Sequence, residues 1–141
     1  MNDRILEIQK LYPRIYMACH VEHVKKRSSK GQISSRDAGI LAHLEQGHFQ
    51  SPKTLAKHLN IAASTLSEAL HNMVALGFVS FKIDENDARQ TKFSLTNDGA
   101  KAISQNSVLD ANKIANMLAR LSEEDQQKVI DGLKLFANAT Y

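Results

Sequence analysis

Apolar and polar positions follow two different periods along the 141 residues of this chain. Between residues 33 and 76, apolar side chains recur at intervals of three and four residues, which is the period of amphipathic helices. Ser34 is followed by Asp37, and Ser51 by Pro52, two arrangements that are typical of helix starts. A break at Asn60 separates the last two of these helices. The pattern therefore predicts three short helices, over about 34–47, 51–59 and 63–76.

The period changes to that of β-strands after Gly77. Phe78–Ile83 and Thr91–Thr96 are rich in aromatic and β-branched residues, and Asp84–Asp87 between them has the composition of a turn. These residues predict a β-hairpin. Because the hairpin follows a helix, a turn and a second helix, the order of elements over residues 33–96 is that of a winged helix-turn-helix.

Longer apolar stripes flank this core on both sides. The first helix is predicted to extend to about residue 27, with Pro13 either kinking it or marking its start. After the hairpin, the pattern predicts one helix over about 97–121 and a last helix that Ser122 caps. The predicted fold class is therefore mainly α with a small β-hairpin wing (α+β), a single domain of residues 1–141 whose core is flanked by helical regions 1–32 and 97–141.

The composition narrows the class of protein without identifying it. Hydrophobic residues make up 43% of the chain, enough for one domain core but not for a second. No apolar run is long enough for a membrane span, and the N-terminus lacks an apolar signal core, so we expect a cytoplasmic protein. The single cysteine, Cys19, rules out an intrachain disulfide and fits a reducing compartment. The net charge of +3 only weakly favours a polyanionic partner.

The hairpin and its flanks carry residues at a spacing that is found in a known family. These residues are Gly77, Phe78, Val79, Lys82, Asp84, Asp87-Ala88-Arg89 and Leu95-Thr96-Asn97-Asp98-Gly99. In this pattern the chain resembles the MarR family of bacterial transcription regulators, and the helical flanks extend the resemblance over nearly the whole chain. The resemblance implies a homodimer, formed through regions 1–32 and 97–141, that binds a pseudo-palindromic operator in double-stranded DNA. It further implies a transcriptional regulator, expected to be a repressor, that a small ligand releases from DNA.

The two helices before the hairpin are expected to contact DNA as a unit. A major groove admits one helix, while a second helix across the backbone sets its angle. Ser51–Leu59 is therefore the expected positioning helix, and Ser64–Asn72 the expected reading segment. The side chains of this segment that can donate or accept hydrogen bonds at base edges are Ser64, Thr65, Ser67, Glu68 and His71.

Positive charge is scarce near the reading segment, because positions 58–81 contain no lysine or arginine. Attraction to DNA phosphates must then come from side chains outside it. The candidates are Lys53, Lys57, Lys82, Arg89 and Lys92, with Arg36 and the basic stretch 25–30 as further sources. We therefore expect weaker or more salt-sensitive DNA binding than a basic reading helix would provide.

The resemblance gives separate roles to two residues of the wing. It implies that Arg89 enters the minor groove, where a guanidinium is attracted by the negative potential of narrow A·T-rich segments. It also implies that Asp87 holds the wing and the arginine in place. The alternative is a solvated ion pair in a surface turn.

Cys19-His20-x-x-His23 is the other cluster with chemical potential. On the predicted first helix, Cys19 and His23 would share a face, as would His20 and His23, a spacing that suits two metal ligands. A reactive thiol that senses oxidants and a buried cysteine beside ordinary histidines are the alternatives. The cluster is too small for a tetrahedral metal site, so no metal and no cofactor is assigned. The resemblance instead implies a cleft for a small aromatic or phenolic effector, with Tyr12, Tyr16, Cys19 and His23 as candidate lining residues.

No enzyme is predicted. The chain has no Gly-rich phosphate loop, no His-Glu-x-x-His motif and no nucleophile motif. Two alternatives to a ligand-released regulator stay open from the residues alone. One is a metal- or oxidant-responsive regulator that uses Cys19 and His23, and the other is a winged-helix protein-interaction module that does not bind DNA.

Overall fold

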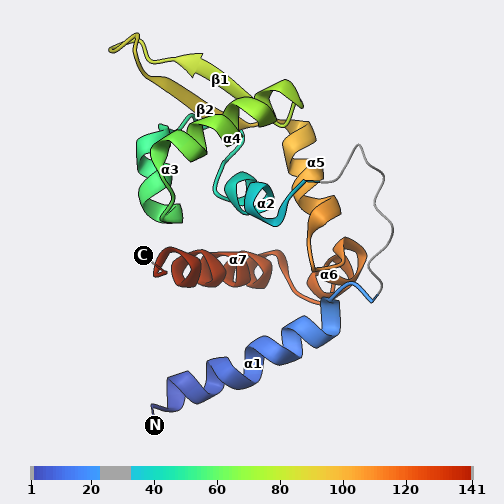
Figure 1. Ribbon diagram of the computed structural model, residues 1–141. Helices are drawn as coiled ribbons and strands as arrows, with labels where there is room; N and C mark the ends of the chain where they lie inside the picture. The colour runs from blue at the N-terminus through green and yellow to red at the C-terminus, as the bar shows by residue number, and fades with distance from the viewer. Residues whose placement is uncertain (1, 23–32, 141) are drawn as a thin grey trace. The chain divides into compact units, whose positions relative to one another are not determined.

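The computed structural model describes residues 2–22 and 33–140, and it comprises two compact units (Figure 1). One unit spans Arg27–Asn106, and the other joins Met1–Lys26 to Ser107–Tyr141. The first unit contains α2 (Ser35–Ala42), α3 (Pro52–Leu59), α4 (Ala63–Ala75), β1 (Val79–Ile83), β2 (Thr91–Leu95) and α5 (Asn97–Asn106). The predicted order of helix, turn, helix and hairpin is confirmed, as is the fold class.

The first two helices of this unit begin where the sequence predicts. The Ser34 side chain accepts a hydrogen bond from the Asp37 amide at 3.1 Å, and the Ser51 side chain accepts one from the Thr54 amide at 3.5 Å. A hydroxyl at this position satisfies an amide that has no partner inside the helix. Asn60 ends α3 in the left-handed conformation, with φ of 51°, and residues 60–62 make the turn into α4.

A third strand-like segment was not predicted. The helix expected over 34–47 ends at Ala42, because the residues that follow pair with β2 instead of continuing the helix. Leu95 N–H donates to the Glu45 carbonyl at 3.0 Å, while Gln50 and Phe93 exchange two backbone hydrogen bonds of 2.8 Å each. The path from α2 to α3 therefore runs along the free edge of the hairpin.

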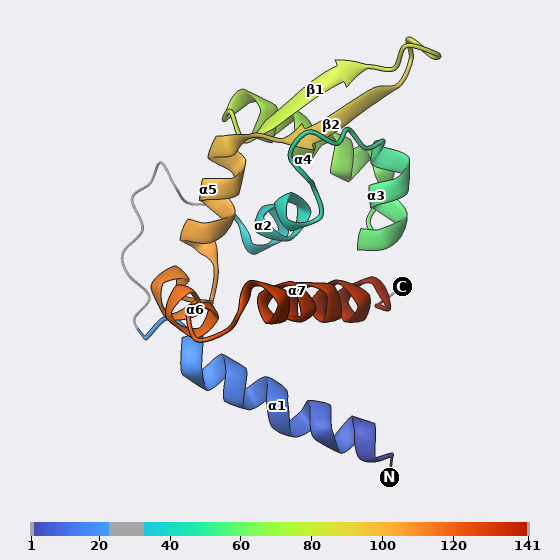
Figure 2. The same ribbon diagram turned by 180° about the vertical axis from the view of Figure 1, so that it is seen from behind.

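The hairpin pairs Val79 with Leu95 at its base and Ile83 with Thr91 near its tip. Each strand is one residue shorter than predicted. The tip stands clear of α2–α5 in both views of the molecule (Figures 1 and 2). On β1 only the base is buried, since Val79 is buried whereas Phe81, on the same strand face, is 55% exposed.

The core of this unit draws on every one of its elements. Its buried members are Ile40, Leu41, Leu44, Leu55, Leu66, Ala69, Leu70, Met73, Val79, Phe93, Leu95 and Ala102. The short helices α2, α3 and α4 thus bury one stripe each against the hairpin base and α5, which is the amphipathic arrangement that the apolar period predicts.

The base of the wing explains the Leu-Thr-x-x-Gly spacing in physical terms. The Thr96 hydroxyl donates to the Gly77 carbonyl at 2.7 Å and accepts from the Gly99 amide at 3.0 Å, which ties the end of α4 to the start of α5. A Cβ at Gly99 would collide with the Phe78 carbonyl oxygen and with the Leu95 side chain. These positions are therefore structural, and they fix where the wing leaves the body of the unit.

The other unit contains α1 (Asp3–Cys19), α6 (Ala111–Leu118) and α7 (Glu123–Asn138). Among its described residues only Cys19 is buried. Its large apolar side chains that lie exposed are Ile5, Leu6, Ile8, Leu11, Tyr12, Ile15, Tyr16, Met17, Val108, Leu121, Val129, Ile130, Leu133, Leu135 and Phe136. Within this single chain, these stripes have little apolar surface of their own unit to pack against.

Two helix predictions in this part of the chain were wrong. The first helix does not reach residue 27: it starts at Asp3, passes through Pro13 and ends at Cys19, with His20 in an extended conformation. The chain pairs there with the segment before α6, since Val21 N–H donates to the Val108 carbonyl at 2.9 Å and Asp110 N–H to the Cys19 carbonyl at 2.7 Å. These backbone bonds replace the helical ones.

The second wrong prediction is the single helix over 97–121, which is divided into α5 and α6. The Asp110 carboxylate caps α6 by accepting hydrogen bonds from the amides of Asn112 and Lys113, at 2.8 and 3.1 Å. Ser107 accepts a further bond from the Leu109 amide at 3.0 Å. Side chains that compete for backbone amides in this way start a new helix instead of continuing the old one. The cap that Ser122 was predicted to provide for α7 is confirmed by its 3.1 Å bond to the Asp125 amide.

No helix in the described part of the chain combines the length and the apolar character that crossing a membrane would require.

Gly99→Ala should lower the free energy of unfolding by about 1–3 kcal/mol, because its Cβ has to displace the Phe78 backbone. Gly39→Ala in α2 is the matched control, since nothing lies within 4 Å of the added Cβ. The control should raise stability by about 0.5–1 kcal/mol through helix propensity. Urea denaturation measures both, and equal effects at the two sites would contradict the close approach at Gly99.

Candidate nucleic-acid interface

The predicted DNA contacts divide into an exposed set and a half-buried set. On α4, the side chains of Ser64, Glu68 and His71 are exposed, while Thr65 and Ser67 are half-buried. On α3, Lys53 and Lys57 are exposed. The outward face of α4 is therefore polar and accessible along its first two turns.

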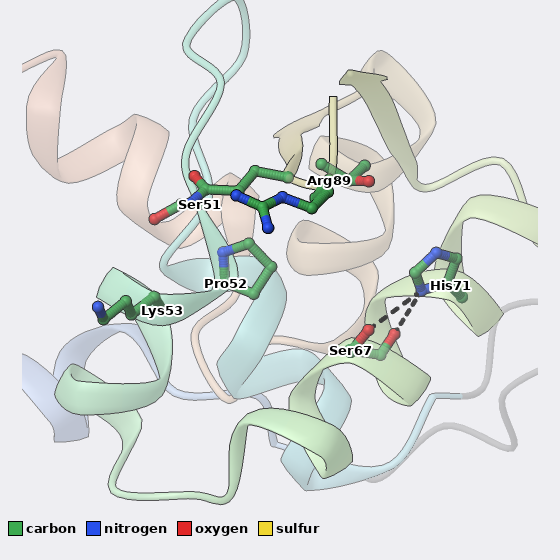
Figure 3. A pocket seen from close by; sticks show the side chains of 8 residues that line it. Ser51, Pro52, Lys53, Ser67, His71 and Arg89 are labelled. Atoms are coloured by element: carbon green, nitrogen blue, oxygen red, sulfur yellow. Dashed lines mark hydrogen bonds between the residues drawn. The ribbon is translucent and has the colours of Figure 1, made fainter. Parts of the chain in front are cut away.

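A hollow of about 280 Å³ lies between the start of α3, the outer face of α4 and the end of the wing turn (Figure 3). Its lining residues are Ser51, Pro52, Lys53, Ser67, His71, Arg89, Gln90 and Thr91. The Arg89 side chain reaches across toward Ser51 and Pro52, and His71 faces the hollow from α4 (Figure 3). Residues from three elements thus meet at one polar surface.

The hollow brings together some of the predicted site residues and leaves out others. Lys53, Ser67, His71 and Arg89 line it, whereas the other predicted contacts lie outside it. Those others are Ser64, Thr65, Glu68, Lys57, Lys82 and Lys92. Ser51, Gln90 and Thr91 were not predicted as contacts. The sequence predicted Ser51 only as a helix cap. Its position two residues before Lys53, at the start of the positioning helix, is the signal that could have marked it as a contact.

Asp87 holds the arginine of the wing through two contacts. Its Oδ1 accepts a hydrogen bond from the Arg89 amide at 3.1 Å and another from Arg89 Nε at 3.2 Å. The Gln90 amide donates to the Asp87 carbonyl at 2.9 Å, which closes the same turn. The arginine side chain nevertheless stays 91% exposed, so its terminal nitrogens are accessible from solvent.

A second carboxylate organises the other half of the wing turn. Asp84 Oδ1 accepts from the Asn86 amide at 2.9 Å, and its Oδ2 lies 3.7 Å from Lys92 Nζ. Lys92 is thus partly neutralised by an ion pair that the sequence did not predict. The attraction of Lys92 to a phosphate is weaker than that of an unpaired lysine, because the nearby Asp84 carboxylate repels the phosphate.

Lys82 and Lys92 are directly opposite each other on the two strands, an arrangement in which like charges repel. Each finds a separate partner. Lys82 Nζ lies 4.6 Å from the centre of the Phe49 ring, a cation–π contact, and Lys92 pairs with Asp84. The two lysines are therefore held apart, and Lys82 is drawn toward the segment that precedes α3.

His71 is held on α4 by its own helix and by the hairpin. Its Nδ1 lies 2.7 Å from the Ser67 carbonyl oxygen and 3.5 Å from the Ser67 hydroxyl (Figure 3). The rings of His71 and Phe93 make an edge-to-face contact, with 5.5 Å between ring centres and 80° between ring planes. The imidazole is exposed to solvent but fixed in orientation.

The cluster around Cys19 is not arranged as predicted. Because α1 ends at Cys19, His20 lies beyond the helix, and His23 lies outside the described residues. The Cys19 thiol is buried and donates to the Ile15 carbonyl at 3.1 Å. Within residues 2–22 and 33–140, no three or more histidine, cysteine, aspartate or glutamate side chains are grouped to hold a metal ion.

Two of the predicted effector-pocket residues lie exposed on α1. Tyr12 is exposed, and the Tyr16 ring stacks on His20 with 5.2 Å between ring centres and 20° between ring planes. His20 Nδ1 also donates to the Tyr16 carbonyl at 3.1 Å. These contacts fix the end of α1, and the effector pocket itself stays a prediction.

Comparison with known proteins identifies the class of this fold. A family model described as MarR family matches residues 32–90, which contain α2, α3, α4, β1 and the wing turn. This segment is a MarR-family domain. The members of the MarR family are DNA-binding transcription regulators and not enzymes. A comparison of the sequence with curated proteins finds no match.

Several solved structures share the fold. A point mutant of MepR from a multidrug resistant S. aureus clinical isolate is 19% identical, covers 98% of this chain and 94% of that chain, and has a TM-score of 0.62. The transcriptional regulator Tm0710 from Thermotoga maritima is 20% identical over 97% and 92%, with a TM-score of 0.55. The PcaV transcriptional regulator from Streptomyces coelicolor, in complex with its natural ligand, is 18% identical over 97% and 91%, with a TM-score of 0.51. At these identities the likeness establishes the fold.

Asp87→Ala should lower the free energy of unfolding by less than about 1 kcal/mol, because both of its side-chain contacts are at the surface. Ser51→Ala should cost about 1 kcal/mol, since it removes the cap of α3. Urea denaturation of the two variants measures whether the contacts of the wing turn contribute to the free energy of unfolding of the whole domain. A loss above about 2 kcal/mol for Asp87→Ala would show that the turn supports the core.

Proposed function

We propose that this MarR-family regulator binds a pseudo-palindromic DNA operator as a homodimer, acts as a repressor and is released by a small organic ligand. The observation that carries the DNA-binding part is the joint presentation of Arg89, Lys53 and the face of α4 around one exposed hollow. Positioning helix, reading helix and wing tip are the three parts with which a winged helix engages a duplex.

The two grooves are assigned to different elements. The exposed side of α4 carries Ser64, Glu68 and His71 and suits the major groove, which is wide enough for a helix. Arg89 lies in the wing turn with an exposed side chain and suits the adjacent minor groove, where narrow A·T-rich segments concentrate negative potential. Asp87 supports this role because it orients the arginine without covering its terminal nitrogens.

Affinity in this mechanism comes from few charges. Lys53 and Lys57 on α3 face solvent and are candidates for phosphate contacts beside the major groove. Lys82 and Lys92 on the wing are engaged by Phe49 and Asp84, so they contribute less attraction. Glu68 on α4 repels phosphates. We therefore propose that binding depends strongly on salt and on the wing arginine.

The exposed apolar stripes of α1 and α7 support the proposed homodimer. Among the described residues of the unit that contains α1 and α7, only Cys19 is buried, and large exposed apolar surfaces are typical of interfaces. A second copy of the same chain offers the same stripes and can cover them by two-fold symmetry. A dimer also suits the DNA, because one α4 covers a single half-site.

Release by an organic ligand is the proposed mode of regulation. The PcaV regulator has been solved with its natural ligand, which supports a ligand site in this fold. Tyr12, Tyr16, Cys19 and His23 remain the candidate lining residues. A buried thiol that donates to a helix carbonyl behaves as a small apolar side chain, so Cys19 favours this mode over oxidant sensing.

Leu133→Glu on α7 should convert the dimer into a monomer at micromolar concentration, because an unpaired carboxylate would be buried in the interface. Lys134→Glu, which places the same charge at an exposed polar position of the same helix, is the matched control and should stay dimeric. Sedimentation velocity measures both. A wild-type monomer with a single half-site footprint, in place of two half-sites centred about 10 base pairs apart, would contradict the proposed dimer.

Arg89→Ala should weaken binding to a selected operator by about 1–3 kcal/mol without changing the dimer or the melting temperature. Sequencing of duplexes selected by the purified wild-type protein supplies the operator. Equilibrium titrations at several salt concentrations then measure the change.

Lys92→Ala provides the contrast, since it should reduce the salt dependence of binding on all sequences alike, by at most about one released ion per subunit. Unchanged operator affinity in Arg89→Ala at moderate salt would remove the wing from the proposed mechanism. Failure of the wild type to select any duplex would instead favour a protein-interaction module.

A further inference from the structure

The hydrogen-bonding character of the reading surface is set by two side chains on α4. Glu68 and His71 are both exposed, are three residues apart and therefore lie on the same face of the helix. Positions 58–81 contain no lysine or arginine, so the charged donors that usually read guanine are missing from this surface. Glu68, when ionised, can only accept hydrogen bonds.

The hydrogen bond to Ser67 indicates the tautomer of the neutral His71 imidazole. Nδ1 lies 2.7 Å from the Ser67 carbonyl oxygen, and a carbonyl oxygen has no hydrogen to donate. Nδ1–H must therefore be the donor of this bond. In the neutral imidazole the second nitrogen, Nε2, is then unprotonated and can only accept.

The orientation of that acceptor is fixed before any partner arrives. The Ser67 bond and the edge-to-face contact with Phe93 hold the ring on two sides. Nε2 lies on the far side of the ring from Ser67, and His71 lines the hollow that faces Arg89 (Figure 3). A side chain held in this way does not lose rotamer freedom on binding, which makes its recognition more selective.

We propose that His71 reads an exocyclic amino group in the major groove, adenine N6 or cytosine N4, by accepting a hydrogen bond at Nε2. This inference rests on the proposed function, in which α4 enters the major groove. Adenine N6 and cytosine N4 are the groups that donate there, while guanine O6, thymine O4 and the purine N7 atoms accept. An acceptor at Nε2 is attracted to the first two and repelled by the others.

Glu68 extends the same chemistry along the helix. Its carboxylate accepts from an amino group for the same reason, and side chains three residues apart reach neighbouring base pairs. The reading surface thus selects for amino groups at adjacent steps and compensates for its lack of positive charge by matching donors with acceptors.

The test replaces one amino group at a time in the selected operator. Each adenine of the half-sites is replaced by purine, which lacks the 6-amino group, and each cytosine by 2-pyrimidinone, which lacks the 4-amino group. At one position, wild-type affinity should fall about five- to tenfold, as expected for one lost hydrogen bond with an unpaired partner. His71→Ala should bind the unmodified operator as weakly as the wild type binds the operator that lacks this amino group. Removing the amino group should not lower the affinity of His71→Ala further.

Two further variants test whether the loss of affinity in His71→Ala comes from the missing acceptor and not from misfolding. His71→Phe retains a ring beside Phe93 but has no acceptor, so it should reproduce the His71→Ala result. His48→Ala removes another exposed histidine, outside both α4 and the hollow, and should bind and discriminate as the wild type does. Thermal melting of each variant confirms that it is folded.

Two outcomes would overturn this inference while leaving the proposed function intact. One is operator binding in which every amino-group replacement costs the wild type and His71→Ala the same factor. The other is a coupling between His71 and guanine, seen as a loss on 7-deazaguanine substitution, because Nε2 would then be donating to N7. If the wild type selects no duplex at all, the proposed function fails and this inference fails with it.

Discussion

The backbone and side chain of Phe93 join the parts of the winged helix that are proposed to touch DNA. Its N–H and C=O exchange two 2.8 Å hydrogen bonds with Gln50, which fixes the chain directly before Ser51 and the start of α3. Its buried side chain belongs to the core, and its ring makes an edge-to-face contact with His71 on α4. As a member of β2 it also anchors the strand that follows Arg89. Phe93 therefore contacts or anchors all three parts: the positioning helix, the reading helix and the wing. The hollow between them keeps its shape as long as Phe93 stays packed.

The wing shows how geometry and charge compete in a small turn. Asp84 and Asp87 each accept a backbone amide two residues further on, which is what lets a short loop reverse direction without a glycine at its tip. The same carboxylates bring two negative charges to a surface that is proposed to approach phosphates. The arrangement limits this cost because each carboxylate is paired with a cation of the wing, Lys92 or Arg89. What remains for DNA is the exposed end of the arginine, so recognition by the wing is concentrated in one side chain.

Local chemistry explains which elements were predictable from the sequence. The caps at Ser34, Ser51 and Ser122 depend on residues three positions away, and all three were predicted correctly. The pairing of residues 45–50 with β2 was missed because its partners are more than forty positions apart in the sequence and carry no local signal. The end of α1 at Cys19 was missed for the same reason, since it depends on backbone bonds to residues 108 and 110. Of the site, residue types predicted the polar face of α4 and the arginine of the wing, but the hollow that gathers Ser51, Gln90 and Thr91 required the fold.

The helical unit outside the winged core carries the strongest argument for coupling between assembly and recognition. With Cys19 as the only buried residue among those described, the unit has no core with which to stabilise α1 and α7. In the proposed homodimer, a second copy supplies the missing apolar surface, so ordering these helices and associating the chains become one equilibrium that depends on protein concentration. The spacing of the two reading helices is then a property of the dimer and not of the chain. A ligand that binds beside α1 can change this spacing only through a different affinity for the two arrangements, which is the thermodynamic condition that any effector of this protein has to meet.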